Sequence, residues 1–361
     1  MSDLAYIALA GVPGIGRARL DLLLAAFGDA TSVLRASPQA LASTPGISRA
    51  AATAIRRASL DGAGQLLART EACGGQILLP DHPAFPTILT AIPDAPVLLF
   101  ALGRTELLGR PALAVVGSRE HTRYGAEACR HLAGGAARAG LVIVSGMARG
   151  IDALAHRAAL EVPGDTIGVL GNGFGVIYPS ANRELYQDVG RDGCFITEFP
   201  PGERPNAGSF PRRNRLISGL ARATLVIEAR ERSGALITVD CALAQGREVM
   251  AVPGPITSPV SLGCNRLIQH GAKPALGLRD ILEEYGLAPQ ADAHAAVPSN
   301  LTDDERQVLT LVGEGTQHVD AIAARVGRDA ATTLAVLTSL EIRGLVAQDR
   351  GMLFRRAIGS R

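Results

Sequence analysis

The sequence contains no tryptophan, and aromatic residues make up only 4% of its 361 positions. Hydrophobic residues account for 47% and charged residues for 19%, which excludes a disordered chain. With so few aromatic side chains, the core must be built mainly from alanine, leucine, valine and isoleucine. The length allows two or three domains.

Long apolar runs and paired cysteines are also missing. No stretch of about 18 apolar residues occurs, and the N-terminus lacks a charged region followed by a long apolar one, so we expect neither a membrane span nor a secretory signal. The five cysteines are scattered without a CxxC pair, so we expect no metal and no redox pair. An odd number of cysteines in an apolar chain indicates buried thiols, and we therefore expect a cytoplasmic protein.

The charge balance gives no overall attraction to nucleic acid or membrane, because the formal net charge is only +2. Anion binding must therefore come from local clusters. Lys273 is the only lysine, so nearly every positive charge is an arginine. Biased codon usage is the simpler explanation of this excess, but guanidinium groups still bind phosphate bidentately and stack on bases.

Motifs of several enzyme classes are absent. There is no GxxxxGK[ST], GxSxG or HExxH sequence, and no GxGxxG follows the first predicted strand of the sheet. Asp152 and His156 lie one helical turn apart and could form an acid–base pair. The simpler interpretation is that Asp152 caps a helix and His156 packs beneath the site. We therefore expect no catalytic residues and no cofactor.

Residues 1–74 are predicted to form a helical domain. Two segments in it, Gly11–Ala18 and Thr44–Ala50, share a Pro-Gly turn, one apolar residue, a small residue and a following helix. This pattern resembles the helix-hairpin-helix (SAM-like) motif, in which free backbone amides at a helix N-terminus meet a phosphate. An ordinary turn between two helices explains it equally well.

Residues 75–287 are predicted to form an α/β domain. Prolines make residues 75–110 irregular, apart from a strand at 97–101. Later, continuous apolar runs end at glycine-containing loops and alternate with helical segments, which is typical of a doubly wound, mostly parallel, Rossmann-like sheet. The strands are expected at 112–116, 141–144, 166–170, 194–197, 225–228 and 248–252, and helices at 125–139, 151–160, 213–221 and 235–244.

A linker is predicted at 288–300 and a winged-helix domain at 301–361. Thr302 and Glu305 form a capping-box pattern before the first of three helices, at 303–312, 319–326 and 330–343. Strands at 345–348 and 352–355 would form the wing. The third helix is poor in base-reading side chains, so weak contact with duplex DNA, a protein contact and dimerisation all remain open.

Four loops of similar chemistry follow the predicted strands. They are Gly117-Ser118-Arg119, Ser145-Gly146-Met147-Ala148-Arg149-Gly150, Gly171-Asn172-Gly173 and Ser233-Gly234-Ala235. Such loops meet in one crevice of an open α/β sheet, where ligands bind. Glycines also simply turn a chain, but four loops of one kind favour an anion-binding crevice.

The segment 208–219 contains three arginines within four positions, Arg212, Arg213 and Arg215. Arg213 and Arg215 cannot share a helix face, so we expect a turn and a helix start that grip two neighbouring phosphates. Phe210 would supply a stacking face for a base. The alternative is a solvated basic turn with Phe210 in the core.

Together, these segments resemble the DNA processing protein A family (DprA, also called Smf). The resemblance extends over about residues 112–275, and Phe210-Pro211-Arg212-Arg213-Asn214-Arg215 is its most specific part. It implies a homodimer, formed through the Rossmann-like domain, that binds single-stranded DNA, protects incoming DNA and helps load RecA recombinase during natural transformation. The DNA-binding residues expected from the loops and the resemblance are Gly117, Ser118, Arg119, Ser145, Gly146, Arg149, Gly171, Gly173, Tyr178, Asn182, Ser209, Phe210, Arg212, Arg213, Asn214, Arg215, Ser233 and Gly234.

The sequence departs from the family pattern at a few positions. The family usually has an acidic residue in place of Gly175 and often a basic one near Ser180 or Ala181, which puts affinity in doubt. A nucleotide- or phosphosugar-processing enzyme of a related Rossmann type is the alternative. Such enzymes carry a Pro-Gly-Gly-x-Gly-Thr motif, whereas this chain has Ser233-Gly234-Ala235-Leu236-Ile237-Thr238.

Overall fold

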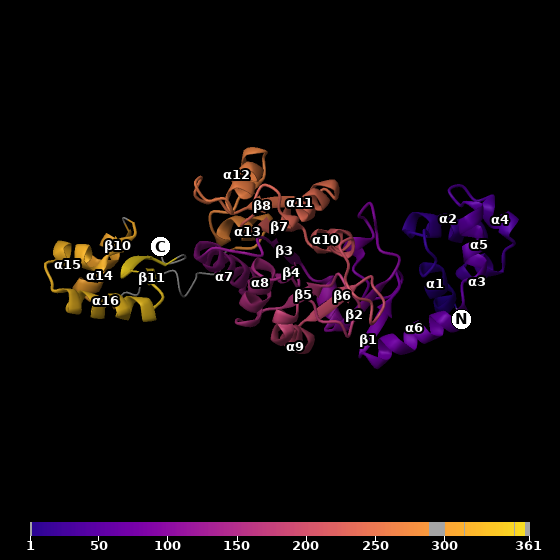
Figure 1. The fold of residues 1–361 in the computed structure, drawn as a ribbon, viewed down its shortest axis with the longest axis horizontal. Helices are drawn as coiled ribbons and strands as arrows, with labels where there is room; N and C mark the ends of the chain where they lie inside the picture. The colour runs from indigo at the N-terminus through magenta and orange to yellow at the C-terminus, as the bar shows by residue number, and fades with distance from the viewer. Residues whose placement is uncertain (1, 289–299, 314, 350, 358–361) are drawn as a thin grey trace. The chain divides into compact units, whose positions relative to one another are not determined.

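The computed structural model describes residues 2–288, 300–313, 315–349 and 351–357. The chain divides into two compact units, Met1–Gly286 and Leu287–Arg361. Each unit is described by itself (Figure 1).

The first unit begins with short helices, as expected from the sequence. They are α1 (Ser2–Ala10), α2 (Arg17–Phe27), α3 (Ala30–Arg35), α4 (Pro38–Ala42), α5 (Arg49–Arg56) and α6 (Leu60–Ala72). Serine side chains cap α4, α5 and α6 by accepting backbone N–H bonds, which satisfies donors that a helix start leaves free. Leu9, Leu20, Leu23 and Ile55 are fully buried in a small core between these helices.

The two Pro-Gly turns are repeats of one structure. In the first turn, the Val12 N–H donates to the Leu9 carbonyl at 3.0 Å and the Ile15 N–H donates to the Val12 carbonyl at 3.1 Å. In the second turn, the Thr44 N–H donates to the Leu41 carbonyl and the Ile47 N–H to the Thr44 carbonyl, both at 3.1 Å. The turn glycines Gly14 and Gly46 have φ of 81° and 79°, which a side chain would strain. The repeat that the sequence indicated is therefore also a repeat in three dimensions. Whether either turn binds DNA stays a prediction.

The rest of the unit is built on a nine-stranded sheet in the order β1-β2-β6-β5-β4-β3-β7-β8-β9. The strands are β1 (Gly75–Leu78), β2 (Leu99–Gly103), β3 (Ala112–Val116), β4 (Val142–Gly146), β5 (Thr166–Val169), β6 (Cys194–Thr197), β7 (Ala223–Val226), β8 (Glu248–Ala251) and β9 (Lys273–Pro274). The strands from β6 to β9 in this order are parallel, and β1 and β2 add an antiparallel edge. The predicted mostly parallel α/β sheet is confirmed.

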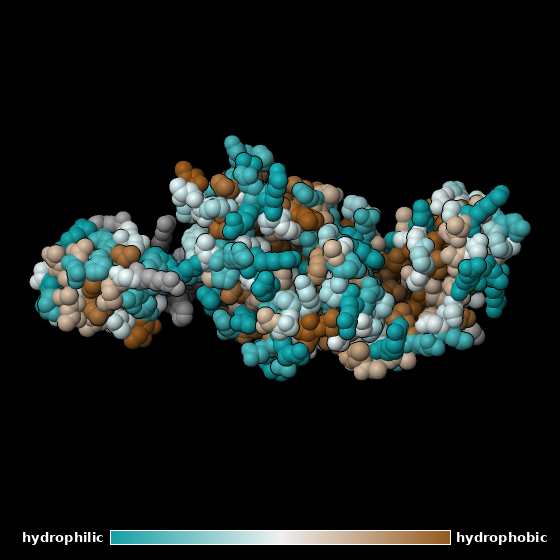
Figure 2. All heavy atoms as spheres, in the orientation of Figure 1, coloured by the Kyte–Doolittle hydropathy of each residue, from teal (hydrophilic) through white to brown (hydrophobic). Residues whose placement is uncertain are grey.

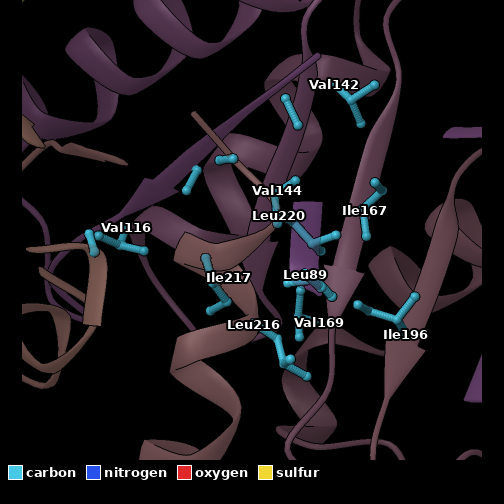
Figure 3. Packing of buried hydrophobic residues seen from close by; sticks show 14 of the residues in the cluster. Leu89, Val116, Val142, Val144, Ile167, Val169, Ile196, Leu216, Ile217 and Leu220 are labelled. Carbon is cyan, nitrogen blue, oxygen red and sulfur yellow. The ribbon is translucent and has the colours of Figure 1, made fainter. Parts of the chain in front are cut away.

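Helices cover both faces of this sheet (Figure 1). They are α7 (Arg123–Arg138), α8 (Ile151–Leu160), α9 (Arg183–Asp192), α10 (Ser209–Gly219), α11 (Gly234–Ala244), α12 (Leu262–Gln269) and α13 (Leu278–Glu284). Short 3-10 turns lie at Thr87–Leu89, Thr105–Gly109 and Ser180–Asn182. Leu216 and Ile217 of α10, and Leu220 at its C-cap, pack against side chains of the central strands (Figure 3). This packing fixes one face of α10 on the sheet.

Some local expectations were wrong. Segment 208–219 is helical from Ser209, four residues earlier than expected, because Pro211 falls in the first turn, where its missing N–H is tolerated. The chain also forms β1, β9, α9, α12 and α13, which the sequence did not indicate. Cys73 is exposed and Cys241 partly exposed, so the buried-thiol interpretation holds only for Cys129, Cys194 and Cys264.

The second unit is a winged helix. It contains α14 (Asp303–Gly313), β10 (Gln317–His318), α15 (Val319–Val326), α16 (Ala330–Ile342), β11 (Val346–Asp349) and β12 (Leu353–Arg356). Thr302 and Glu305 form the expected capping box: Glu305 N–H donates to the Thr302 hydroxyl at 3.2 Å, and Thr302 N–H donates to the Glu305 carboxylate at 2.8 Å. The strands of the wing start one residue later than expected. Most of the predicted linker, 289–299, lies outside the described residues.

The surface in Figure 2 is largely hydrophilic over the α/β part of the first unit, with hydrophobic patches between. Within the part of the chain that the structure describes, none of the helices has both the length and the apolar character needed to span a bilayer.

Candidate nucleic-acid interface

A crevice opens at the point where the strand order reverses. The chain runs from β3 to β4 on one side of the sheet, whereas β7 lies on the other side of β3 and leads to β8. The loops after β3 and β7 therefore diverge, and a ligand site is expected between them. They line a cavity of about 520 Å³ together with residues of α10.

A smaller cavity of about 60 Å³ adjoins the first and shares Arg119, Arg149, Phe210 and Arg213 with it. We call the two together the strand-end crevice. Most of the predicted site residues line it: Gly117, Ser118, Arg119, Arg149, Gly171, Tyr178, Phe210, Arg213, Asn214, Ser233 and Gly234. The prediction that four loops from separate segments meet in one crevice is therefore confirmed. Whether the crevice binds DNA stays a prediction.

Exposed arginines surround this crevice. Arg119 and Arg149 were expected there, and Arg230 and Arg232 join them from the loop after β7. We had not selected the last two as site residues, although their position in the same loop as Ser233 was a usable signal. The carboxylates among the lining residues belong to Glu120 and to buried Asp152, so positive charge dominates the opening.

Two aromatic rings form an apolar wall in the smaller cavity. The centroids of Tyr178 and Phe210 are 5.4 Å apart, with the planes tilted by 34°. Tyr178 is 46% exposed, and the Tyr186 hydroxyl donates to its backbone carbonyl at 2.9 Å. The alternative that placed Phe210 in the core is wrong, because Phe210 is only partly buried and lines both cavities. Phe210 therefore lines the crevice and does not belong to the core.

Arg213 lies at the base of the crevice and is only 6% exposed. Its guanidinium donates to the Val169 carbonyl, and Nε lies 3.3 Å from the Asn214 side-chain oxygen. We expected Arg213 to help grip a phosphate, but the helix turns residue 213 toward the sheet, where its guanidinium is buried. Arg213 therefore supports the floor of the site.

Asp152 provides the counter-charge for Arg213. Burial raises the pKa of Asp152 above its ordinary value, opposed by the Arg213 guanidinium, and burial lowers the pKa of Arg213, opposed by Asp152. A Cβ on Gly146 would lie 2.6 Å from both groups, so only glycine leaves room for them there. The expectation that Asp152 caps α8 was wrong, because the N-cap residue of this helix is Gly150.

His156 packs beneath this pair, as predicted. It is fully buried, with Nε2 2.9 Å from the Gly146 carbonyl and Nδ1 2.7 Å from the Thr166 hydroxyl. Because a carbonyl only accepts, Nε2 donates to Gly146. Burial lowers the pKa of His156 to about 4, so the ring is neutral at pH 7.

Several predicted residues support the crevice without lining it. Ser145 donates to the Val115 carbonyl at 2.6 Å, and Asn182 donates to the carbonyls of Met147 and Ala148, next to Arg149. Ser209 bonds to the backbone of Asn206. Gly173 approaches Pro200 so closely that a Cβ would lie 1.8 Å from the Pro200 oxygen.

Arg212 and Arg215 point to the opposite side of α10. Both reach the Glu198 carboxylate, at 3.7 and 2.8 Å, and line a different cavity.

Among the described residues, no cluster of histidine, cysteine, aspartate or glutamate could hold a metal ion.

The chain is similar in sequence to known proteins over most of its length. The model of the family described as "DNA recombination-mediator protein A" matches residues 76–286, and that of the DprA winged helix domain matches 291–352. Protein Smf of Synechocystis is 33% identical over 98% of this chain and 99% of its own length. Protein Smf of Escherichia coli is 41% identical over 75% of each chain.

Solved structures show the same fold. DNA processing protein A from Streptococcus pneumoniae covers 78% of this chain and 97% of its own, with a TM-score of 0.69 and 36% identity. DNA processing protein A from Helicobacter pylori, described for its single-stranded DNA binding mode, covers 56% of this chain and 92% of its own, with a TM-score of 0.52 and 28% identity. With these matches in sequence and in structure, the chain belongs to the DNA recombination-mediator protein A family.

Proposed function

We propose that the strand-end crevice binds single-stranded DNA. The observation that carries this proposal is that four exposed arginines, Arg119, Arg149, Arg230 and Arg232, line the same crevice as the Tyr178–Phe210 wall. Guanidinium groups bind phosphate oxygens, and aromatic faces stack on unpaired bases of any sequence. A duplex hides its base faces, so it gains only the phosphate contacts.

Backbone groups extend the arginine contacts. Gly117, Ser118, Ser233 and Gly234 bring main chain to the opening, where N–H groups at loop and helix starts suit phosphate. These contacts read no base edges. The mode of binding is therefore independent of sequence and steeply weakened by salt.

Membership of the family supports a proposal for the wider role. We propose a recombination mediator that acts in the cytoplasm as a homodimer through the α/β part, protects incoming single strands and helps load RecA during natural transformation. It performs this role by binding and not by catalysis. The single-stranded DNA binding named for the Helicobacter pylori relative supports the first step. RecA-catalysed strand exchange, with and without this protein, tests the loading step.

The decisive experiment compares a fluorescent single-stranded oligonucleotide with its duplex across a salt series. The test variant is Arg119→Ala/Arg149→Ala/Arg232→Ala, whose three side chains are exposed in the crevice. The control is Arg138→Ala/Arg157→Ala/Arg279→Ala, which removes the same charge from exposed positions elsewhere. We expect single-strand preference that is lost in the first variant and kept in the second. Equal losses in both variants would contradict a specific site.

An assay for base release from nucleoside monophosphates addresses the enzyme alternative. Binding alone predicts no release above background. Release that disappears in Arg119→Ala would replace our proposal with a nucleotide-processing activity.

A further inference from the structure

Helix α10 separates two cavities. Phe210, Arg213, Asn214 and Ile217 follow the i, i+3, i+4, i+7 spacing of one helix face and line the strand-end crevice. Arg212 and Arg215 lie on the opposite face and line a second cavity of about 660 Å³. We call it the hairpin cavity, because its other wall is the first Pro-Gly turn and the start of α2, Gly14–Arg19.

The hairpin cavity has the size of a ligand site and a mixed lining. Its apolar side includes Ile7, Leu98 and Phe100. Figure 2 shows a recess with hydrophobic surface between the N-terminal helices and the α/β part of this unit. Four arginines, Arg17, Arg19, Arg212 and Arg215, line the cavity beside two acidic residues, Asp94 and Glu198.

Unpartnered guanidinium nitrogens point to an anion in this cavity. Arg17 binds Asp21 through Nε at 2.8 Å, and Arg215 binds Glu198 through Nη2 at 2.8 Å. The Nη1 atoms of both arginines are buried without a hydrogen-bond partner among the described residues, as is one acceptor, Glu198 Oε2, which lies 3.7 Å from Arg212 Nε. Buried donors are normally satisfied, so a ligand with several acceptor oxygens would complete them.

The Glu198 carboxylate does not reverse this charge. It is 7% exposed and lies between Arg215 and Arg212, so two guanidinium groups face one carboxylate. Arg212 remains 58% exposed and Arg19 is exposed. Both can therefore reach a bound strand.

The two hairpin turns differ at the residue that caps the next helix. Ser48 accepts the Ala51 N–H at 3.1 Å and so caps α5. The matching residue before α2 is Gly16, which has no side chain to cap the helix and lines the cavity. The first amides of α2 are thus left for an external acceptor, whereas those of α5 have one from the protein.

From these observations, we infer that the hairpin cavity is a second phosphate subsite for the single strand held in the strand-end crevice, reached over α10. This inference rests on the proposed function. It extends the DNA footprint from the α/β part onto the N-terminal helices. The chemical class of ligand is the phosphodiester backbone of a continuous strand. Occupancy of the subsite then depends on oligonucleotide length.

Two variants test the subsite. Arg19→Ala/Arg212→Ala removes two exposed cations from the cavity, and Arg35→Ala/Arg49→Ala removes two exposed cations of the same N-terminal helices outside it. Binding is measured with oligonucleotides of about 6 and about 25 nucleotides, which bracket common site sizes. We expect the first variant to weaken binding of the long strand about tenfold and to lower its salt slope by about 1.4, at about 0.7 per lost phosphate contact. Binding of the short strand stays within about twofold.

Gly16→Asp provides an independent test, because it adds a side chain and does not remove the contacts of an existing one. Gly16 has extended backbone angles and open space around its Cβ position, so aspartate can cap α2 and keep the fold stable. Its carboxylate would repel phosphate, so we expect weaker binding of the long strand only. Ser48→Asp places the same negative charge at the start of α5 and should leave binding unchanged.

The outcomes separate the two proposals. If wild type binds neither oligonucleotide, or if the Arg119/Arg149/Arg232 variant binds normally, the proposed function fails. If that variant loses binding while Arg19→Ala/Arg212→Ala and Gly16→Asp behave as their controls, only the hairpin subsite is overturned. Equal weakening of short and long strands also overturns it.

Discussion

Arg213 and Arg215 lie two positions apart on α10 and face opposite sides of that helix. Arg213 is buried against Asp152 beneath the strand-end crevice, whereas Arg215 pairs with Glu198 at 2.8 Å in the hairpin cavity. A cluster of three arginines in the sequence thus serves two sites. Their variants should differ accordingly.

The first prediction concerns the buried charge pair. Arg213→Ala removes the guanidinium that opposes the desolvation of buried Asp152, together with its hydrogen bond to the Val169 carbonyl, and loss of such a charged donor costs about 1.5–3 kcal/mol of unfolding free energy. Arg212→Ala, at the next position but 58% exposed, should cost less than about 1 kcal/mol. Urea unfolding of the full chain measures both. Similar midpoints for the two variants would show that the Arg213–Asp152 pair does not stabilise the fold.

The second prediction concerns the aromatic wall. Phe210→Leu keeps an apolar side chain of similar reach but removes the ring beside Tyr178. A lost stacking contact costs about 1–3 kcal/mol per base, so single-strand affinity should fall at least about fivefold. The loss should be similar for strands of different base composition and should leave the salt slope unchanged. A reduced slope would mean that the substitution displaced an arginine.

The third prediction is a dependence of stability on pH. His156 has a pKa of about 4 in the fold and about 6.5 when unfolded, so between these values only the unfolded chain takes up the proton. The contribution of His156 to the free energy of unfolding is therefore constant above pH 6.5. The free energy of unfolding then falls as the pH drops from 6.5 toward 4, by about 3 kcal/mol in total. Denaturation midpoints of wild type and His156→Asn across this range measure it. Parallel curves for the two proteins would contradict a neutral buried ring.

The sheet and its crevice could be predicted because their signals are local. A run such as Ala112–Val116 is buried on both faces and is apolar throughout, and the loop that follows carries Ser118 and Arg119. The doubly wound class then implies that the carboxyl ends of parallel strands, and so the loops after them, lie together, whereas the order of the strands was not predicted.

The burial of Arg213 could not be predicted in the same way. Its partner, Asp152, lies 61 positions earlier in the chain, and nothing in the arginine-rich segment indicates it. The hairpin cavity also depends on distant packing, because Ile7 and Ala8 of α1 pack in one cluster with Leu98 and Phe100 near β2. Short strands such as β9 (Lys273–Pro274) are too brief to show a period.

The last prediction separates backbone strain from steric contact in the crevice. Gly140 and Gly150 both have positive φ, 95° and 82°. A Cβ on Gly140 would meet nothing within 4 Å, so Gly140→Ala should cost only the conformational penalty, about 1–2 kcal/mol. A Cβ on Gly150 would lie 2.3 Å from the Ser118 carbonyl oxygen and 2.7 Å from the Arg119 backbone.

Gly150→Ala must therefore displace the loop that carries Arg119. We expect it to lower stability more than Gly140→Ala and also to weaken single-strand binding, whereas Gly140→Ala should bind as wild type. Thermal unfolding and anisotropy titrations on both variants give the comparison. If Gly150→Ala lost stability but kept full affinity, the position of the Ser118–Arg119 loop would not limit DNA binding, and the arginines of the β7 loop, Arg230 and Arg232, would have to supply the contacts.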